Sequence, residues 1–247
     1  MCLVAIAEGV TSTSRCSTRL AMTWIDLGNP SPKISPDQYV LVKWQTGEIR
    51  RFAAGGGASN VTFNQVLDTR RSDRQFDSID DKQLGTLLWQ ACRCREVWPS
   101  DLGFDLEHRA TPSAGAIHPI HVLLNIPGDF RWWLYQPQGH YLIELIRAPE
   151  RLAGLLEHSV KVLEGPQAVR MLFAAEPGKT MAKYDAGSSL IWRDAGALLA
   201  VIALTAHAQG LTFCPLGITG EPWASSLADK GQLAGVGFGL LGLAARS

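Results

Sequence analysis

Three strand-like segments follow one another directly between residues 118 and 145 and are separated only by tight-turn signals. Strands joined by such short connections run antiparallel, because a parallel pair needs a long crossover. The segments are His118 to Ile126, Trp132 to Gln136 and Tyr141 to Leu145, with Pro127-Gly128 and Gln138-Gly139 between them. The sequence therefore predicts an antiparallel meander.

Helical segments surround this meander. Leu84, Leu87, Leu88 and Ala91 recur at spacings of three and four behind Asp80-Asp81, which can cap an amphipathic helix. Other helices are expected at Thr62 to Asp68, Pro149 to Leu163 and Ile191 to Gln209, and strands at Val169 to Ala174 and Val236 to Ala244. Strands in runs mixed with helices favour an α+β fold, in which an antiparallel-rich central sheet is flanked by helices.

Residues 1–60 have a different character. They hold Ser/Thr-rich and Pro-rich stretches (Ser12 to Thr18, Asn29 to Pro36), and two β-rich runs from Tyr39 to Phe52 flank Thr46-Gly47 like a hairpin. We interpret residues 1–60 as an N-terminal appendage with a possible β-hairpin, and residues 61–247 as the main domain.

Charge and cysteine content exclude several classes of protein. Lys plus Arg equals Asp plus Glu at 23 each, so nothing in the net charge favours nucleic acid or a membrane surface. The apolar run from Ala195 to Ala206 is shorter than a bilayer requires, and the Leu3 to Ala7 run lacks the shape of a signal peptide. Five scattered cysteines favour a reducing cytoplasm and predict no metal site.

A first motif that could carry chemistry is Arg70-Arg71-Ser72-Asp73-Arg74. Three guanidinium groups and a hydroxyl within five residues can bind a phosphate group, because arginine presents forked donors that match phosphate oxygens. Taken alone, the motif is more often a solvated basic loop.

A second motif runs from Thr111 to Pro119, Thr-Pro-Ser-Ala-Gly-Ala-Ile-His-Pro. Its small residues let backbone amides approach a flat ligand closely. An ordinary loop before a strand is the alternative, and His118 on its own is more often structural than catalytic.

Together the two motifs resemble those of the nitroreductase family, whose members carry an Arg-Arg-Ser stretch early in the domain and a Pro-Ser-rich loop further along. The resemblance covers roughly residues 65–245. It implies a homodimer with FMN at the subunit interface. It also implies that the phosphate and ribityl end of FMN is held by Arg70, Arg71, Ser72 and Arg74, and that the flavin ring lies beside Pro112, Ser113, Ala114 and Gly115.

Further matches resemble one branch of the family, the SagB/McbC-type azoline dehydrogenases. The loop Pro-Ser-Ala-Gly-Ala-Ile-His-Pro is similar to that of the branch, as is Lys183-Tyr184 followed by Asp194-Ala195-Gly196 at the start of a long helix. The resemblance implies acid/base roles for Lys183 and Tyr184 and backbone contacts to FMN from Leu216 and Gly217, with Arg246 as a weaker phosphate contact.

The activity implied is FMN-dependent dehydrogenation of a thiazoline or oxazoline in a peptide or peptide-like natural-product intermediate, beside a cyclodehydratase partner. Oxygen or another acceptor would reoxidise the flavin. Two alternatives stay open: an NAD(P)H-dependent nitro or quinone reductase, and a flavin-free scaffold that keeps the fold for partner binding.

Overall fold

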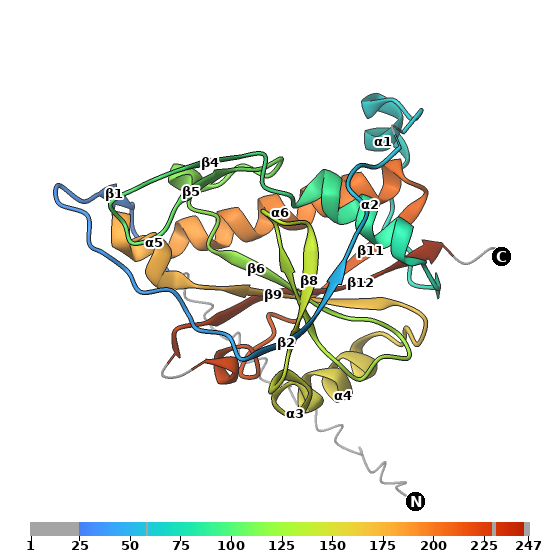
Figure 1. Ribbon diagram of the computed structural model, residues 1–247. Helices are drawn as coiled ribbons and strands as arrows, with labels where there is room; N and C mark the ends of the chain where they lie inside the picture. The colour runs from blue at the N-terminus through green and yellow to red at the C-terminus, as the bar shows by residue number, and fades with distance from the viewer. Residues whose placement is uncertain (1–24, 58, 229–230, 245–247) are drawn as a thin grey trace, which may run out of the picture.

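A sheet of eight antiparallel strands forms the centre of the molecule in the computed structural model, which describes residues 25–57, 59–228 and 231–244. Seven strands follow in the order β11-β12-β9-β6-β7-β8-β2, and β3 pairs with β12 (Figure 1). The bounds are β2 Thr46–Arg51, β3 Phe76–Asp77, β6 Ile120–Asn125, β7 Trp133–Gln136, β8 Tyr141–Leu145, β9 Val169–Ala175, β11 Leu211–Leu216 and β12 Ala234–Ala244. The predicted α+β fold is confirmed.

The predicted meander is β6, β7 and β8, which are adjacent in the sheet. The first of these strands begins later than the sequence suggested. His118 has a backbone φ of 47°, outside the extended region, and so belongs to the preceding loop.

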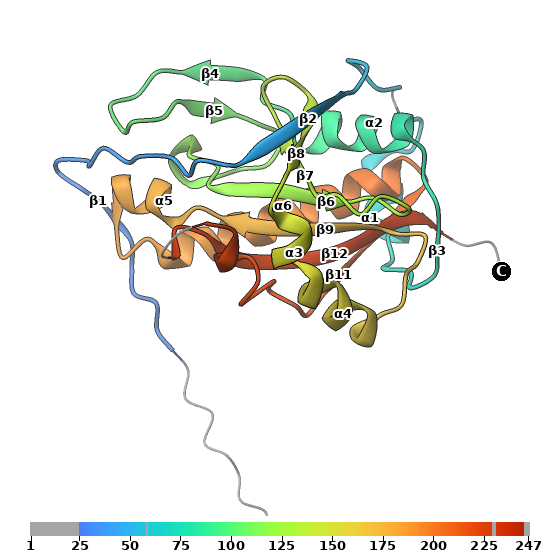
Figure 2. The same cartoon turned by 60° about the horizontal axis from the view of Figure 1, so that its bottom comes forward.

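Helices cover both faces of the sheet (Figures 1 and 2). Helix α2 (Asp81–Ala91) and helix α6 (Ser188–Ala208) pack on one face with β6, β9 and β12, while α3 (Ala148–Arg151) and α4 (Ala153–Val162) lie over the other. Thr62 caps α1 (Phe63–Thr69) and Asp80 caps α2, each in a capping box with a glutamine three residues on. The cap predicted at Asp80 or Asp81 is confirmed at Asp80. The helix predicted from Pro149 to Leu163 is two helices, because the chain leaves helical geometry at Leu152.

Helix α6 has a buried stripe of apolar residues. Ile191, Ala195, Leu198, Ile202 and Ala206 recur at spacings of three and four and join the larger core cluster. Extending from Ser188, it is longer than the apolar run in the sequence. By length and composition it is the one helix in the described part of the chain that could cross a membrane. The stripe is nevertheless what a core helix of a globular domain shows.

The segment before β2 does not form the predicted hairpin. Residues 41–45 contain no strand, and β2 pairs with β8 instead. The physical reason is that backbone N–H groups of this segment form hydrogen bonds with distant parts of the chain instead of with a hairpin partner. The N–H of Val42 donates to the carboxylate of Glu176 at 2.6 Å, and that of Tyr39 to the carbonyl of Leu102 at 2.8 Å. Residues 46–51 thus extend the main sheet, and the domain division at residue 60 stays a prediction.

Smaller elements complete the fold. Strands β4 (Glu96–Trp98) and β5 (Leu106–His108) form a separate ribbon, and β1 (Ser31–Pro32) pairs with β10 (Tyr184–Asp185) directly after helix α5 (Pro177–Lys183). Two short 3-10 helices are η1 (Ala114–Ala116) and η2 (Ser225–Leu227). The stretches Leu3 to Ala7 and Ser12 to Thr18 lie outside the described residues.

Packing of α4 on the sheet can be tested with one pair of variants. Leu155 is fully buried, so Leu155→Ala should lower the free energy of unfolding by about 2–5 kcal/mol in urea denaturation. Val160 on the same helix is 43% exposed, and Val160→Ala should change the free energy of unfolding by less than about 0.5 kcal/mol. Equal losses from the two variants would contradict the orientation of α4.

Candidate functional site

The loop that leads into β6 has unusual backbone geometry. Gly115, Ala116 and His118 have φ values of 65°, 58° and 47°, in the left-handed region that non-glycine residues rarely adopt. Such conformations persist only where the surroundings hold them, and they concentrate at functional sites.

Asp194 on α6 holds this loop. Its carboxylate accepts a hydrogen bond from Ser113 Oγ at 2.5 Å and another from the N–H of Ala114 at 3.2 Å. Ser113 Oγ in turn accepts from the N–H of His118 at 2.9 Å. Burial raises the pKa of Asp194 above its ordinary value, although the bonds from Ser113 and Ala114 act in the opposite direction.

Lys183 and Tyr184 meet this loop at Gly115. A Cβ atom built on Gly115 would lie 2.9 Å from both Lys183 Nζ and Tyr184 Oη. The fold therefore brings together two groups of residues predicted from the sequence, the loop Pro112–Gly115 and the Lys-Tyr pair. Gly115 is suited to this position by its positive φ and by the absence of a side chain.

The arginine-rich loop lies elsewhere, between α1 and β3. Arg71, Ser72 and Arg74 are exposed and Arg70 is half-buried. The N–H of Asp73 donates to Thr212 Oγ1 at the start of β11, and Thr69 Oγ1 lies 2.8 Å from His207 Nε2 near the end of α6. Leu216 and Gly217 are at the far end of β11, which pairs only with β12 within the described chain. Arg246 lies outside the described residues.

Helix α6 separates the two loops. The Pro-Ser loop is tied to Asp194 and the arginine loop is tied near His207, thirteen residues further along, which is about 20 Å at 1.5 Å per residue. A single chain therefore gathers the Lys-Tyr pair and the Pro-Ser loop at one end of α6, and the arginine loop at the other.

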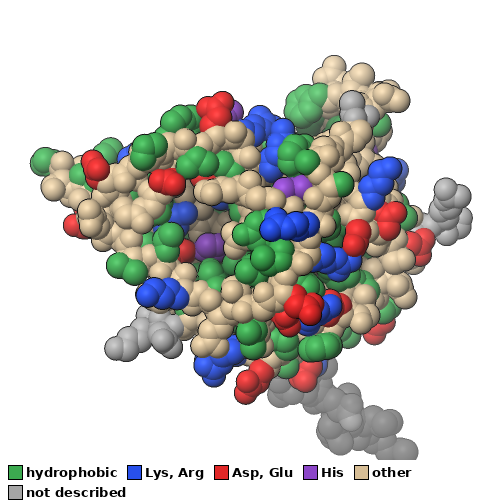
Figure 3. Space-filling model, viewed as in Figure 1, with side chains coloured by type: hydrophobic (Ala, Val, Ile, Leu, Met, Phe, Trp, Pro, Cys, Tyr) green, Lys and Arg blue, Asp and Glu red, His purple; other side chains and the backbone are tan. Residues whose placement is uncertain are grey.

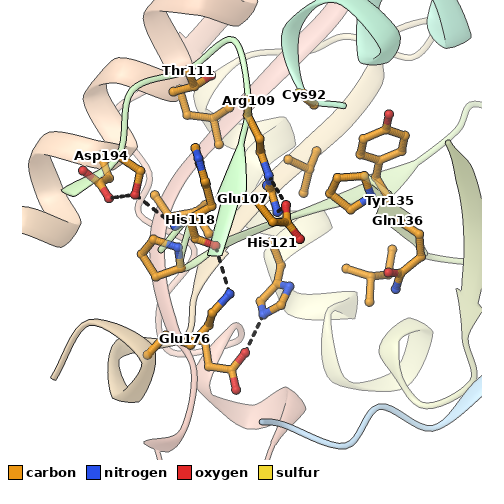
Figure 4. A pocket seen from close by; sticks show the side chains of 18 of the residues that line it. Cys92, Glu107, Arg109, Thr111, His118, His121, Tyr135, Gln136, Glu176 and Asp194 are labelled. Carbon is orange, nitrogen blue, oxygen red and sulfur yellow. Dashed lines mark hydrogen bonds and ion pairs between the residues drawn. The ribbon is translucent and has the colours of Figure 1, made fainter. Parts of the chain in front are cut away.

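A cavity of about 270 Å³ with both polar and apolar walls opens beside the Pro-Ser loop (Figure 4). Pro112, Ser113 and Asp194 form one wall. The rest of the wall includes an ion pair of Arg109 with Glu107 at 2.6 Å and a hydrogen bond between His121 Nε2 and Glu176 at 2.8 Å. Burial lowers the pKa of His121. A hollow ringed by histidine, basic and acidic side chains is visible left of the centre of Figure 3.

Burial changes the pKa values of several cavity groups. Burial, with the charge of Arg109 nearby, lowers the pKa of His118 to about 3, so this imidazole is neutral. Burial and Arg109 also lower the pKa of Lys179 to about 8. Burial would raise the pKa of Glu176, but hydrogen bonds from His121 and Val42 outweigh it and the net shift is downward.

Sequence reasoning missed most of these cavity residues. Glu107, Arg109, His121, Glu176 and Lys179 come from β5, the loop after it, β6 and the start of α5, and no short motif contains them. The sequence offered one signal for these residues. Glu176 is a charged residue that directly follows the apolar run Phe173-Ala174-Ala175. Among the described residues, no group of three or more His, Cys, Asp or Glu side chains could hold a metal ion.

Comparison with known proteins agrees with this geometry. The fold is of the flavin-type oxidoreductase class, an antiparallel sheet between helices with a small-residue loop beside a cavity. The model of the nitroreductase family matches residues 67–229, and the chain belongs to the nitroreductase family. A comparison with curated protein sequences gave no match.

Solved structures share the fold at low sequence identity. A candidate nitroreductase from Ralstonia eutropha JMP134 is 21% identical with a TM-score of 0.62, over 88% of this chain and all of that one. One from Anabaena variabilis is 19% identical with a TM-score of 0.55, over 83% of this chain and 40% of that one. The Escherichia coli microcin synthetase McbBCD complex is 16% identical with a TM-score of 0.53, over 78% of this chain and 76% of that one.

Asp194 should give stability a pH dependence. Because its pKa is raised in the folded protein, its contribution to stability is fully present below the ordinary aspartate pKa and is lost as pH rises through the raised value. Asp194→Asn removes this titration. Relative to wild type, the free energy of unfolding of the variant should therefore rise as the pH increases above the ordinary aspartate pKa of about 3.9.

Urea denaturation at several pH values measures this difference. Asp101→Asn, at an exposed position, is the matched control. A difference between Asp194→Asn and wild type that stays constant over the range would contradict the burial of a titrating carboxylate.

Proposed function

We propose that this protein binds FMN and dehydrogenates a thiazoline or oxazoline ring in a peptide or peptide-like intermediate. The observation that carries the proposal is the convergence of Lys183 Nζ and Tyr184 Oη on Gly115. Two groups able to transfer a proton then lie beside a loop that a flat ring can approach closely.

The arginine loop fits the phosphate of FMN. Among the described residues, Arg70, Arg71 and Arg74 form no ion pair with a carboxylate, so their donors are free for an anion. Ser72 adds a hydroxyl, and Arg70 Nη1 already points to Ser72 Oγ at 3.4 Å. At the ring end, Pro112, Ser113, Ala114 and Gly115 carry small side chains, and Leu216 and Gly217 end the free edge of β11.

The chemistry gives each group a role. Aromatising an azoline removes a proton from the former α-carbon and a hydride from the neighbouring carbon, and bound FMN would supply the hydride acceptor. One of Lys183 and Tyr184 would take the proton, because both side chains reach the loop at Gly115. Asp194 would keep that loop in position through Ser113 and Ala114.

A second copy of the chain would complete the site. The arginine loop and the Lys-Tyr pair are held at opposite ends of α6, which favours a site assembled from two chains. Apolar side chains are also left exposed near each end: Phe63 at 65% and Leu67 at 54% on α1, and Trp192 at 48% on α6. Helix α1 projects from the body of the molecule beyond α6 (Figure 1). Burial of these side chains in a symmetric homodimer would stabilise it.

A cyclodehydratase is the partner that this chemistry requires, since it makes the azoline. The similarity to a chain of the microcin synthetase complex supports this choice at the level of the fold alone. A cytoplasmic location stays a prediction from the cysteine pattern.

The cofactor is tested by the visible spectrum of the purified protein. We expect flavin bands that are released as FMN on denaturation, and Arg71→Ala should lose them because it removes a phosphate contact. Arg95→Ala, at an exposed position of the β4–β5 region, should keep them. A folded, colourless protein that cannot be reconstituted with FMN would overturn the proposal and favour a flavin-free scaffold.

The reaction is tested with a model azoline and mass spectrometry. Loss of two hydrogens from the ring supports the dehydrogenase, whereas rapid oxidation of NAD(P)H with a nitroaromatic or quinone acceptor and no ring oxidation supports the reductase alternative.

Sharing of the site between chains is tested by mixing two inactive variants. Arg71→Ala and Lys183→Met should each lower turnover by about 10²-fold or more. If one site combines the arginine loop of one chain with the Lys-Tyr pair of the other, each mixed dimer keeps one intact site. An equal mixture should then recover about a quarter of wild-type activity. If one chain supplies both parts, every site in a mixed dimer carries a substitution and no activity returns.

A further inference from the structure

The cavity beside the Pro-Ser loop passes between two strands of the central sheet. Within the described chain, β6 pairs with β7 only at Leu123–Leu134 and Leu124–Trp133, while β6 stays paired with β9 from Ile120 to Asn125. Successive residues of a strand point to opposite faces of a sheet, yet His121 and Val122 both line the cavity. The two strands therefore separate, and the cavity reaches from one face of the sheet to the other.

A buried ion pair occupies this opening. Figure 4 shows Glu107 and Arg109 with His118 on one side, Tyr135 and Gln136 on the other, and His121 below them. Their side chains are only 12% and 13% exposed. Arg109 uses Nε and Nη2 for Glu107, whose other oxygen accepts from Gln138 Nε2 at 2.9 Å. Arg109 Nη1 forms no hydrogen bond with a described residue.

Lys179 is the second cation of the cavity, and it has no carboxylate partner among the described residues. Its Nζ lies 3.4 Å from the carbonyl oxygen of His118 and 4.8 Å from the centre of the Phe104 ring. The nearby Glu176 forms no ion pair with Lys179, and its two carboxylate oxygens bond His121 and the N–H of Val42. The cavity wall thus holds two cations, Arg109 and Lys179, and Lys179 forms no ion pair with a described carboxylate.

The wall groups favour one kind of ligand. Two cations with unused donors call for an anion, and the ionised Glu107 and Glu176 would repel a dianion such as phosphate. Apolar wall residues, among them Trp44 and Leu134, suit a ring. A volume of about 270 Å³, close to the lower end of the range of about 300–1,000 Å³ for ligand pockets, suits a small ring.

We infer that this opening binds a small ring that bears a single free carboxylate, held by Lys179 Nζ and Arg109 Nη1, with the ring directed at Pro112 and Ser113. This inference rests on the proposed function and narrows its substrate class. The substrate would be an azoline carboxylic acid, either free or at the end of a chain, and not a ring with peptide on both sides.

The probe is 2-methylthiazole-4-carboxylate, a stable analogue of the aromatic product, and its carboxamide is the neutral control. We expect calorimetry on the wild-type protein to show binding of the acid at least tenfold tighter than of the carboxamide, because charge-assisted bonds are lost with the amide. Lys179→Gln should weaken acid binding at least tenfold. Lys161→Gln, at an exposed position on α4, should not.

A pH series supplies a second readout that needs no disruptive substitution. Lys179, with a pKa of about 8, loses its charge between pH 7 and pH 9.5, so wild-type affinity for the acid should fall across that range. Neither His118, with a pKa of about 3, nor Cys92, whose burial raises its pKa to about 12, changes charge there. Lys179→Arg keeps its charge throughout and should remove the dependence.

Equal affinity for acid and amide, no binding of the acid, or a Lys179→Gln protein that binds like wild type would each overturn the inference. Its failure is distinguishable from failure of the proposed function. A protein that retains no FMN but binds the acid through Lys179 contradicts the function alone. A protein that retains FMN and oxidises an azoline amide as fast as the acid contradicts the inference alone.

Discussion

Helix α6 packs lengthwise on the central sheet through Ile191, Ala195, Leu198, Ile202 and Ala206, and this contact sets the positions of both candidate loops. Each fully buried aliphatic side chain contributes roughly 1.5–3 kcal/mol, so the helix is held firmly by its stripe. Asp194 near its start then fixes the Pro-Ser loop, and His207 near its end contacts the arginine loop. The separation of the two loops within one chain is thereby set by one rigid element.

Glu176 has a similar organising role on the other side of the cavity. Its two carboxylate oxygens hold the N-terminal segment at Val42 and the β6 side chain of His121. Loss of either partner would lower the stability of the fold, because the desolvation of the buried carboxylate would no longer be compensated by a hydrogen bond. The same reasoning applies to the pair Glu107 and Arg109, which lines the cavity together with residues of β6 and β7. Replacing such a pair with apolar residues would often be neutral for stability, which makes a role in binding the more natural reason for its presence.

Local sequence predicted the elements whose signals are local. The capping residue Asp80, the apolar spacing of α2 and the short turns of the β6–β8 meander depend on neighbours within a few residues, and each was confirmed. The hairpin from Tyr39 to Phe52 failed because the partners of that segment, Glu176, Leu102 and β8, are distant in the sequence. Likewise, the break at Leu152 depends on how α3 and α4 fit over the sheet. The residue at the break is neither a proline nor a glycine, so its type did not predict the break.

By itself, the sequence determined the α+β class, the amphipathic helices and two motifs, Arg70 to Arg74 and Thr111 to Pro119, whose residue types suit a phosphate and a flat ring. Tertiary structure decided which of these residues meet. It placed Lys183 and Tyr184 against Gly115, kept the arginine loop at the far end of α6, and opened the sheet around Arg109 and Lys179. The reason is physical: spacing along a chain specifies which face of an element is apolar, whereas the meeting of distant side chains depends on how those faces pack and on which buried charges find partners.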